Sequence, residues 1–351
     1  INAASEGIMV SGDNIRIVNC TIKDSGGNGI HFSGSSNVVV DGCTVVNANL
    51  TSGVGHEDGC IIWSDECQNT TVTNCCVENG ISGFGAIDTD DNSDVTIANC
   101  TIKNCRTSAI DLAVNNYKPA NIIVTGNRIY NSVAVLIRDS SGSLAAAVPN
   151  KVVIENNYLE KTAVQLHHVR DILFRGNIVD VTGASIIVPI DIKNSDHITV
   201  DGNLIIGGDY GIYVSDTLSS SADVLIASNQ MKNQRLTGIA LTTSGRPNIN
   251  AIGNDVSSDT SAATTYSGIS LESGCMAKAN MVNLAAGQYG IVCGNSSYAL
   301  DNIVRTPASV PSIRTSGGST GVLIIGNLTT QAISNGGGAG NTLLNNQTIT
   351  V

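Results

Sequence analysis

One short pattern recurs along nearly the whole chain. Segments such as NIRIVNCTI, DVTIANCTI, KVVIENNYL and HITVDGNLI share the form x-V-x-V-x-x-N-x-I, in which Cys or Asn fills an anchor position about every 26 residues. The anchors are Cys20, Cys43, Cys75, Cys100, Asn127, Asn157, Asn177, Asn203, Asn229, Asn254, Asn280, Asn302 and Asn327. A single unit of this length cannot bury its apolar face alone, so the repeat predicts a solenoid in which successive units stack.

Each repeat predicts several short strands. Apolar and polar residues alternate before each anchor, which is the period of a half-buried strand. A second apolar run, for example GIHF, GAIDT or GIYVS, lies upstream in each repeat, and a preceding Gly fits a tight bend. No stretch shows a helical period. Stacking such coils at about 4.8 Å predicts an all-β fold, a parallel β-helix of about 13 coils, that forms a single domain over residues 1–351.

The anchor column has a physical explanation inside such a solenoid. An inward Asn can bond to the backbone and to the Asn of the next coil, so that a ladder satisfies every buried amide. Cys can fill the same place by packing as a small hydrophobic residue. We therefore expect Cys20, Cys43, Cys75 and Cys100 to point inward as reduced thiols, although stacked neighbours would be close enough for a disulfide.

The composition limits the classes of partner. Hydrophobic residues make up 42% of the chain, which is enough for a large core, and the net charge is −11. This acidic surface would repel a phosphate backbone or anionic lipid headgroups, so nucleic acid is not an expected partner. No apolar run approaches the roughly 18 residues of a membrane span. The first residues lack a signal-peptide pattern and start almost inside a repeat, so we expect the trimmed body of a longer chain.

The repeat resembles a known family. The pattern GI-x-L, a short turn and then NVTI-x-x-N-x-I is similar to the pectate-lyase-like β-helix superfamily, over nearly the whole chain. The resemblance implies a right-handed parallel β-helix, and the superfamily includes polysaccharide lyases, glycoside hydrolases and phage tailspike depolymerases. GHED at Gly55–Asp58 differs from the GHG motif of polygalacturonases, and neither a matching RIK nor the YGFDPH-like motif of mannuronan epimerases is present.

Among these families the acidic chain most resembles the body of a bacteriophage tailspike. That resemblance implies an endo-acting depolymerase of a bacterial surface polysaccharide, either a capsule or a lipopolysaccharide O-chain. It also implies a homotrimer located on the virion tail, or else a secreted protein.

Charged residues concentrate on one predicted face. Aligning the upstream strands by their distance to the next anchor predicts an outward column that includes Ile61, Asp88 and Asp111, with Trp63 in the next outward column. In the third to seventh coils these two columns contain Asp88, Asp90, Asp111, Arg138, Gln165, His167, Asp191 and Lys193. Later coils have Ala, Ser and Thr there. Outward strand positions are normally polar, but a merely solvated face would not need charges gathered in the middle.

Paired carboxylates indicate glycoside hydrolysis. Asp88 and Asp111 would lie on adjacent coils about 5 Å apart, and Asp88 and Asp90 about 7 Å apart. Separations of about 5.5 Å accompany retention, and those of about 6.5–9.5 Å accompany inversion. Clustered like charges raise the pKa of one carboxyl, which makes a general acid available. We expect Asp111 to be the acid, shielded by the loop of Tyr117, and Asp88 or Asp90 to activate water. Arg138 and Lys193 would bind acidic groups of the sugar chain.

Two other functions remain open. The three Asp residues could hold Ca²⁺ through hard oxygen ligands, while a neighbouring base abstracts a proton beside a uronate carboxylate, which would make the protein a lyase. The candidate bases are Arg138, His167 and Lys193. Hydrolysis by paired carboxylates would need no cofactor. The second alternative is a non-catalytic adhesin or stalk. Besides Arg138, the candidates for sugar contact are Glu57, Asp58, Trp63, Tyr117, Gln165, His167, Asp191 and Lys193.

Overall fold

The computed structural model shows short strands joined by turns. It describes residues 6–48, 59–64, 67–80, 85–90, 92–106, 108–114, 120–139, 150–216, 223–243, 248–259, 267–285, 289–336 and 338–349. These ranges contain no helix, and accordingly no helix in them could cross a membrane. The chain divides into two compact units, Ile1–Val179 (unit 1) and Asp180–Val351 (unit 2). The expectation of a single domain over the whole chain stays a prediction.

Unit 1 contains three parallel sheets, which we call A, B and C, and the chain visits them in turn. Sheet A holds β1 (Ile8–Ser11), β4 (Ile30–Ser33), β7 (Gly59–Ser64), β10 (Gly85–Asp90), β13 (Ser108–Val114), β16 (Ala134–Asp139) and β19 (Ala163–His167). Sheet B holds β2 (Arg16–Val18), β5 (Ser36–Asp41), β8 (Gln68–Thr73), β11 (Ser93–Ala98), β14 (Ala120–Thr125), β17 (Asn150–Glu155) and β20 (Arg170–Arg175). Sheet C holds β3 (Thr21–Lys23), β6 (Thr44–Val46), β9 (Cys76–Glu78), β12 (Thr101–Lys103), β15 (Arg128–Tyr130) and β18 (Tyr158–Glu160).

Unit 2 repeats the same three-sheet coil, and β21 (Ile178–Asp180) contains the division between the units. Its part of sheet A holds β22 (Ile190–Lys193), β25 (Tyr210–Asp216), β28 (Thr237–Thr243), β31 (Ser267–Leu271), β34 (Tyr289–Cys293), β37 (Ile313–Thr315) and β40 (Ile333–Ser334). Sheet B holds β23 (Asp196–Asp201), β26 (Asp223–Ala227), β29 (Asn248–Ile252), β32 (Met276–Lys278), β35 (Tyr298–Leu300), β38 (Leu323–Ile325) and β41 (Thr342–Leu344). Sheet C holds β24 (Leu204–Ile206), β27 (Gln230–Lys232), β30 (Asp255–Ser258), β33 (Met281–Leu284), β36 (Ile303–Arg305), β39 (Leu328–Thr329) and β42 (Gln347–Thr348).

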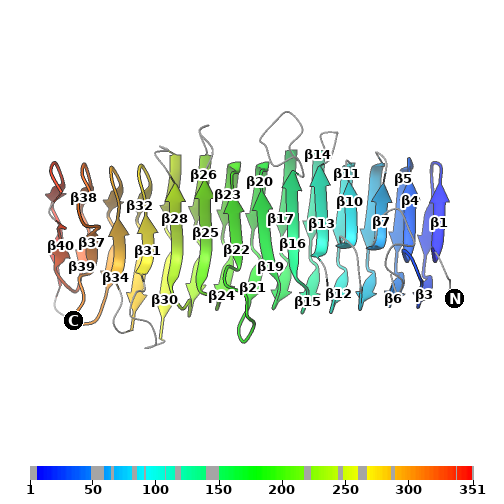
Figure 1. Cartoon of the computed structure of the whole chain (residues 1–351), viewed down its shortest axis with the longest axis horizontal. Helices are drawn as coiled ribbons and strands as arrows, with labels where there is room; N and C mark the ends of the chain where they lie inside the picture. Colours follow the sequence, from blue (N-terminus) through cyan, green and yellow to red (C-terminus); the bar gives the residue numbers. More distant parts are fainter. Residues whose placement is uncertain are drawn as a thin grey trace. The chain divides into compact units, whose positions relative to one another are not determined.

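Each passage through sheets A, B and C is one coil of a β-solenoid. Within each unit the strands of one sheet stand side by side, one from each coil (Figure 1). The described residues contain fourteen strands of each sheet, one coil more than the roughly 13 predicted from the anchors. The prediction of an all-β parallel solenoid is confirmed.

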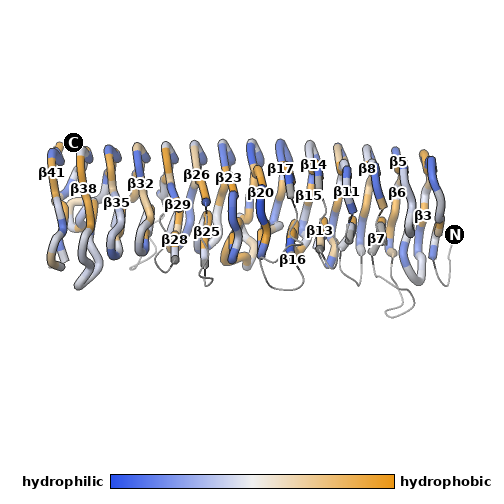
Figure 2. Tube along the Cα trace, turned by 90° about the horizontal axis from the view of Figure 1, so that it is seen from above, coloured by the Kyte–Doolittle hydropathy of each residue, from blue (hydrophilic) through white to orange (hydrophobic). Residues whose placement is uncertain are grey.

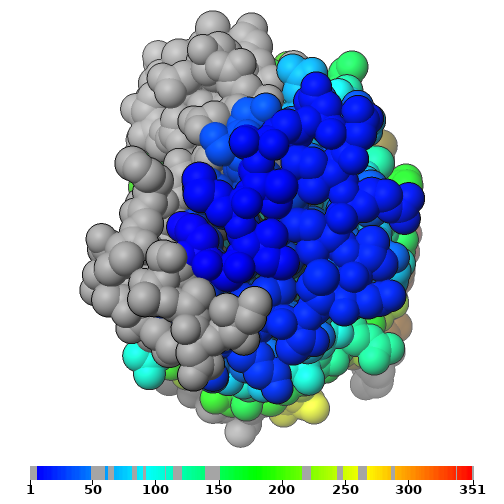
Figure 3. Space-filling model, turned by 90° about the vertical axis from the view of Figure 1, so that its right-hand side faces the viewer, coloured from blue at the N-terminus to red at the C-terminus, as the bar shows by residue number. Residues whose placement is uncertain are grey.

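Alternating side chains build the core of each unit. Along β5, Val38 and Val40 are fully buried while Val39 between them is only partly covered. The same alternation gives the banded pattern of apolar and polar segments along the coils (Figure 2). Figure 3 faces the first coils of unit 1, where the described atoms, in blue, pack closely across the coil. Burial of one face of every strand therefore supplies the main stabilisation, as the repeat predicted.

The predicted asparagine ladder is present. In unit 2 the Oδ1 of Asn254 accepts the backbone N–H and the Nδ2 of Asn229, both at 3.0 Å. The Nδ2 of Asn254 donates to the carbonyl oxygen of Ile226 and to Oδ1 of Asn280, both at 2.9 Å. The pattern continues through Asn327 to Asn346, whose Oδ1 accepts from the Asn327 side chain at 2.9 Å. Asn346 was not among the predicted anchors. Each ladder amide thus exchanges bonds with both neighbouring coils.

A left-handed residue precedes most anchors. Asn19, Asn74 and Asn99 have φ of 54°, 56° and 55°, and Gly42 and Gly126 take the same conformation. This region is unfavourable for most L-residues, and Gly and Asn tolerate it best. The turn from sheet B to sheet C therefore explains why Asn or Gly so often stands directly before the anchor Cys or Asn.

The cysteine column lies where the anchors predicted it. Cys43, Cys75 and Cys100 are almost completely buried, Cys20 in the first coil is half-buried, and all ten cysteines are free thiols. Burial raises the pKa of Cys43. It raises the pKa of Cys293 to about 12. Since the thiolate is the reactive form, these buried thiols should be inert near neutral pH.

Thiol titration checks this arrangement. In the native protein we expect Cys20 and Cys76, the two half-buried cysteines, to react with a disulfide reagent before all others. Cys43, Cys75 and Cys100 should react only when urea exposes them, because all three are almost completely buried and the reagent cannot reach their sulfur atoms. Labelled peptides identified by mass spectrometry give the order. Early native labelling of all three buried residues would contradict the inward column.

Candidate functional site

Adjacent strands of sheet A bring the predicted aspartates together. Asp88 of β10 pairs in register with Asp111 of β13. Their neighbours Ile87 and Leu112 are buried in the core, so the two aspartates project from the opposite, outer face of the sheet. Neighbouring strands are about 4.8 Å apart, so the sequence-based expectation of a paired carboxylate on adjacent coils agrees with the strand register.

The two carboxylates are not open to solvent. Asp88 is 2% exposed and Asp111 is 1% exposed, although both stand on the outer face of the sheet. The expected groove was an open face of outward polar residues, and the structure differs from that expectation. Burying two carboxylates is costly unless charges and hydrogen bonds compensate them. Their burial therefore requires a dedicated set of partners and is not an ordinary property of a strand surface.

Arg138 is one such partner. It pairs in register with Ala113, one coil after Asp111, and reaches back to the aspartate. Its Nη2 lies 3.3 Å from Oδ2 of Asp111, and its Nε lies 3.5 Å from Oδ1. The arginine side chain is 30% exposed, so it links the buried carboxylate to the surface. A guanidinium in this position stabilises the charged form of a carboxylate. The structure thus assigns Arg138 a contact with Asp111.

Further predicted residues lie beside this pair. In unit 1, Gln165 follows Leu136 in the column of Asp111, and His167 pairs with Arg138. Both Gln165 and His167 are half-buried. Unit 2 contains Asp191, which pairs with Tyr213, and the exposed Lys193, which pairs with Ser215. Asp88, Asp111, Arg138, Gln165 and His167 therefore occupy one face of unit 1, as predicted.

The predicted register of β7 is wrong by one residue. Ile61, expected to point outward, is fully buried and pairs with Ile30 and Ile87 of the core. Ile62 instead pairs with Asp88, and Trp63 takes the register position of core residue Phe32. One more residue separates Ile61 from Cys75 than separates Ile87 from Cys100. Counting back from the anchor therefore failed, because a one-residue change in a turn exchanges the two faces of a strand.

Several predicted residues lie outside the described residues. Glu57, Asp58 and Tyr117 belong to segments that the structure does not describe. Asp90 and Trp63 have described strand positions, with Asp90 in register with Ala113, but their side chains are not described. Their expected roles in catalysis and sugar contact stay predictions.

Sequence reasoning missed a polar cluster in the first coils. His31 stands on the same outer face of sheet A and is 4% exposed. Its Nδ1 lies 3.9 Å from Oε1 of Glu6, and the same oxygen accepts the Nδ2 of Asn28 at 3.2 Å. The signal in the sequence was the GIHF segment, in which the polar residue of the alternation is a histidine. Buried titratable groups thus occur at two places on this face.

A histidine between two carboxylates was also missed, in unit 2. The Nδ1 of His197 lies 3.3 Å from Asp196, and its Nε2 lies 3.6 Å from Asp223. Oδ1 of Asp196 accepts the backbone N–H groups of His197 and Asp223, both at 3.0 Å. The Asp-His pair that opens β23 and the Asp at the start of β26 were the available signals. The cluster borders a cavity of about 340 Å³.

The described side chains do not form a metal centre. Within these ranges no group of three or more His, Cys, Asp or Glu side chains is arranged to hold a metal ion. The expected calcium ligands include Asp90, whose side chain is not described, so a calcium site with this residue stays a prediction.

Solved structures of two bacteriophage tailspike proteins share the fold of this chain. In the solved structures, the tailspike protein 3 of bacteriophage CBA120 superposes with a TM-score of 0.55 at 11% identity, over 89% of this chain and 56% of that one. A mutant tailspike protein of E. coli bacteriophage HK620, in complex with a pentasaccharide, gives a TM-score of 0.50 at 11% identity, over 97% of this chain and 70% of that one. This chain thus spans just over half the length of the CBA120 protein. No curated protein matches the sequence.

The sequence also matches a family profile. The profile described as "Right handed beta helix region" matches residues 1–150 and 91–217. Together these matches cover more than half of the chain, and they agree with the three parallel sheets of each unit. The chain belongs to the right-handed β-helix family.

Proposed function

We propose that this protein is an endo-acting depolymerase that hydrolyses a bacterial surface polysaccharide at the outer face of sheet A in unit 1. The observation that carries the proposal is the pair of buried, in-register aspartates, Asp88 and Asp111, with Arg138 held against one of them. The fold shared with tailspikes, one of them in complex with a pentasaccharide, supports the substrate class.

The contact of Arg138 suggests a role for each carboxylate. Because the guanidinium stabilises the charged form of Asp111, we propose that Asp111 is the nucleophile or base. Asp88, adjacent to that charged group in an inaccessible position, is then the general acid. This order is the reverse of the one expected from the sequence. Neighbouring strands put the pair close to the separation of about 5.5 Å that accompanies retention of configuration.

The burial of the pair sets a condition on catalysis. A sugar chain cannot touch carboxylates that are 1–2% exposed, so the site must open when the polysaccharide binds. Arg138, which is partly exposed, then meets the substrate first. We propose that its guanidinium binds an acidic group or a hydroxyl of the sugar as the chain approaches Asp111.

The chemical products decide between hydrolysis and its alternatives. Incubation of the protein with purified capsular polysaccharides and O-chains should produce new reducing ends without ultraviolet absorbance from an unsaturated uronate. A hydrolase adds water across the glycosidic bond, whereas a lyase leaves a double bond. Appearance of the unsaturated product would establish the lyase, with calcium dependence as its second test. Binding without any new reducing end would establish the adhesin.

Two further expectations accompany this function. We propose a homotrimer that acts outside the cell from a virion tail, in line with the likeness to phage tailspikes. Sedimentation velocity at micromolar concentration separates a trimer from a monomer, and a clean monomer would contradict the proposed assembly of this chain.

A further inference from the structure

Unit 2 has a groove along the described residues at the ends of its sheet C strands. Three cavities of about 600, 380 and 480 Å³ follow one another along these turns. The first two share Asn233, and the second and third share Asn283, Leu284 and Ala285. Cavities that share lining residues are neighbours, so these three follow one another across successive coils, beside strands of sheet C, whereas the aspartate pair belongs to sheet A. We call this series of cavities the groove.

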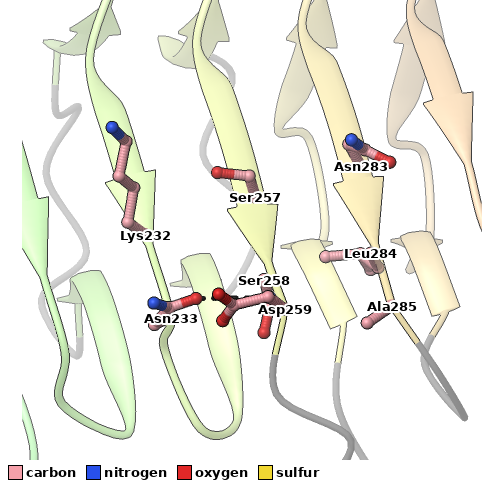
Figure 4. Close-up of a pocket in the computed structure, with 8 residues that line it drawn as sticks. All are labelled: Lys232, Asn233, Ser257, Ser258, Asp259, Asn283, Leu284 and Ala285. Atoms are coloured by element: carbon pink, nitrogen blue, oxygen red, sulfur yellow. Dashed lines mark hydrogen bonds between the residues drawn. The ribbon is translucent and has the colours of Figure 1, made fainter.

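One row of side chains follows the groove. Lys232 of β27, Ser257 of β30, Asn283 of β33 and Arg305 of β36 are partners in strand register, one from each successive coil. Figure 4 shows Lys232, Ser257 and Asn283 projecting from three neighbouring strands beside the cavity. Neighbouring coils are about 4.8 Å apart, so the row presents a hydrogen-bonding group at a regular interval.

Apolar side chains flank this polar row. Met281 and Ile303, two residues earlier on the same strands, are partners in register and are 39% and 37% exposed. Ligand sites combine apolar contact area with a few polar groups that fix orientation. A pyranose ring presents both apolar C–H faces and hydroxyl groups, so a sugar chain matches a surface of this kind.

The two cations in the row have no ion-pair partner among the residues that the structure describes. Lys232 and Arg305 are both exposed, and neither has an ion pair with another described residue. By contrast, Arg235, which lines the first cavity, is held at 2.6 Å by Asp209. One carboxylate, Asp259, lies in the second cavity, where its backbone N–H donates to Oδ1 of Asn233 (Figure 4). The groove therefore offers two cations and one carboxylate, beside the hydrogen-bonding groups of Ser257 and Asn283.

We infer that this groove binds a linear acidic polysaccharide lengthwise across the coils of unit 2. Lys232 and Arg305 contact its acid groups, Asn283 and Ser257 bond to hydroxyls between them, and Asp259 accepts hydroxyl protons. The regular interval of the row suits a polymer with a regular repeat. The inference rests on the proposed action on polysaccharide, and it adds a binding site separate from the place of cleavage.

Affinity electrophoresis tests the groove. The probes are polygalacturonate as the acidic polymer and dextran as the neutral one, and the protein is Asp88→Asn/Asp111→Asn, so that cleavage does not interfere. In this background Lys232→Ala/Arg305→Ala should weaken binding to polygalacturonate by about tenfold, since both exposed charges that would contact the acid groups are lost. Lys278→Ala, an exposed lysine on sheet B of the same unit, is the matched control and should bind normally.

Three results would overturn the inference: no retardation of the background protein by polygalacturonate, equal binding by the double groove variant, or equal retardation by dextran. None of them bears on the aspartate pair. If cleavage persists in Asp88→Asn/Asp111→Asn while the groove variants still lose affinity, the proposed catalytic site fails and the groove stands.

Discussion

We expect Asp88→Asn and Asp111→Asn each to lower the rate of polysaccharide cleavage by about 10²–10⁴-fold, the usual contribution of a general acid or base. Asn preserves the size of the side chain but neither ionises nor supplies a proton at neutral pH. Binding of the intact polysaccharide should persist, because the amide removes little contact area. The measurement is the initial rate of formation of reducing ends, with affinity electrophoresis as the parallel measurement of binding.

The matched control for these variants is Asp94→Asn. Asp94 is an exposed residue of β11 in the same unit, and it has a φ of 55° that Asn accommodates. Its substitution should leave the rate unchanged. If Asp88→Asn and Asp111→Asn both retain the full rate, cleavage takes place elsewhere on the chain, and Glu57 and Asp58, which precede Trp63 in the sequence, are the next candidates.

A purely structural role makes a different prediction for the same variants. If the buried aspartates only support the packing of sheet A, Asp111→Asn should lower thermal stability because Arg138 loses its charged partner. The rate per folded molecule would then stay at the wild-type value. Thermal denaturation measured on the same samples separates the two roles.

The second large effect concerns the asparagine ladder. Asn254→Ala should lower the free energy of unfolding by about 2–4 kcal/mol. The substitution removes four hydrogen bonds at a position that is 1% exposed. It also leaves the amide of Asn229 and Oδ1 of Asn280 short of a partner inside the solenoid. Urea denaturation followed by circular dichroism measures the loss.

Asn250→Ala is the control for the ladder. Asn250 lies on β29 of the same coil, half-buried on the outer side of the sheet, so its loss should cost less than about 0.5 kcal/mol. Equal losses for the two variants would show that the ladder contributes no more than an ordinary surface amide. A broadened transition in Asn254→Ala would indicate that coils unfold separately, as stacked repeats can.

The repeat could be predicted from the sequence because it depends on a short-range periodicity of apolar and polar residues. Alternation of apolar and polar residues along each strand indicates which face is buried. The column of anchor residues indicates the position of one turn that every coil makes. The fold class, the inward cysteines and the asparagine ladder therefore followed from residues close together in the chain. Asn346 was not predicted as an anchor because the final repeat is shorter than the others.

Register and burial across coils depended on the tertiary structure. The extra residue between Ile61 and Cys75 exchanged the faces of β7, and a one-residue change in a turn leaves no trace in the local pattern. The sequence predicted that Asp88 and Asp111 share a face. It could not predict that both are buried, because accessibility depends on what packs over a surface.

The groove of unit 2 could not be predicted from the sequence, because it also depends on strand register. Lys232, Ser257, Asn283 and Arg305 lie 22–26 residues apart, and each is unremarkable in its own strand. Only the strand register places them in one row. Local periodicity thus determined that the chain forms a solenoid and which residues face its interior. The packing of coil on coil decided which polar residues become neighbours, because contacts between coils depend on turn lengths that the periodicity does not constrain.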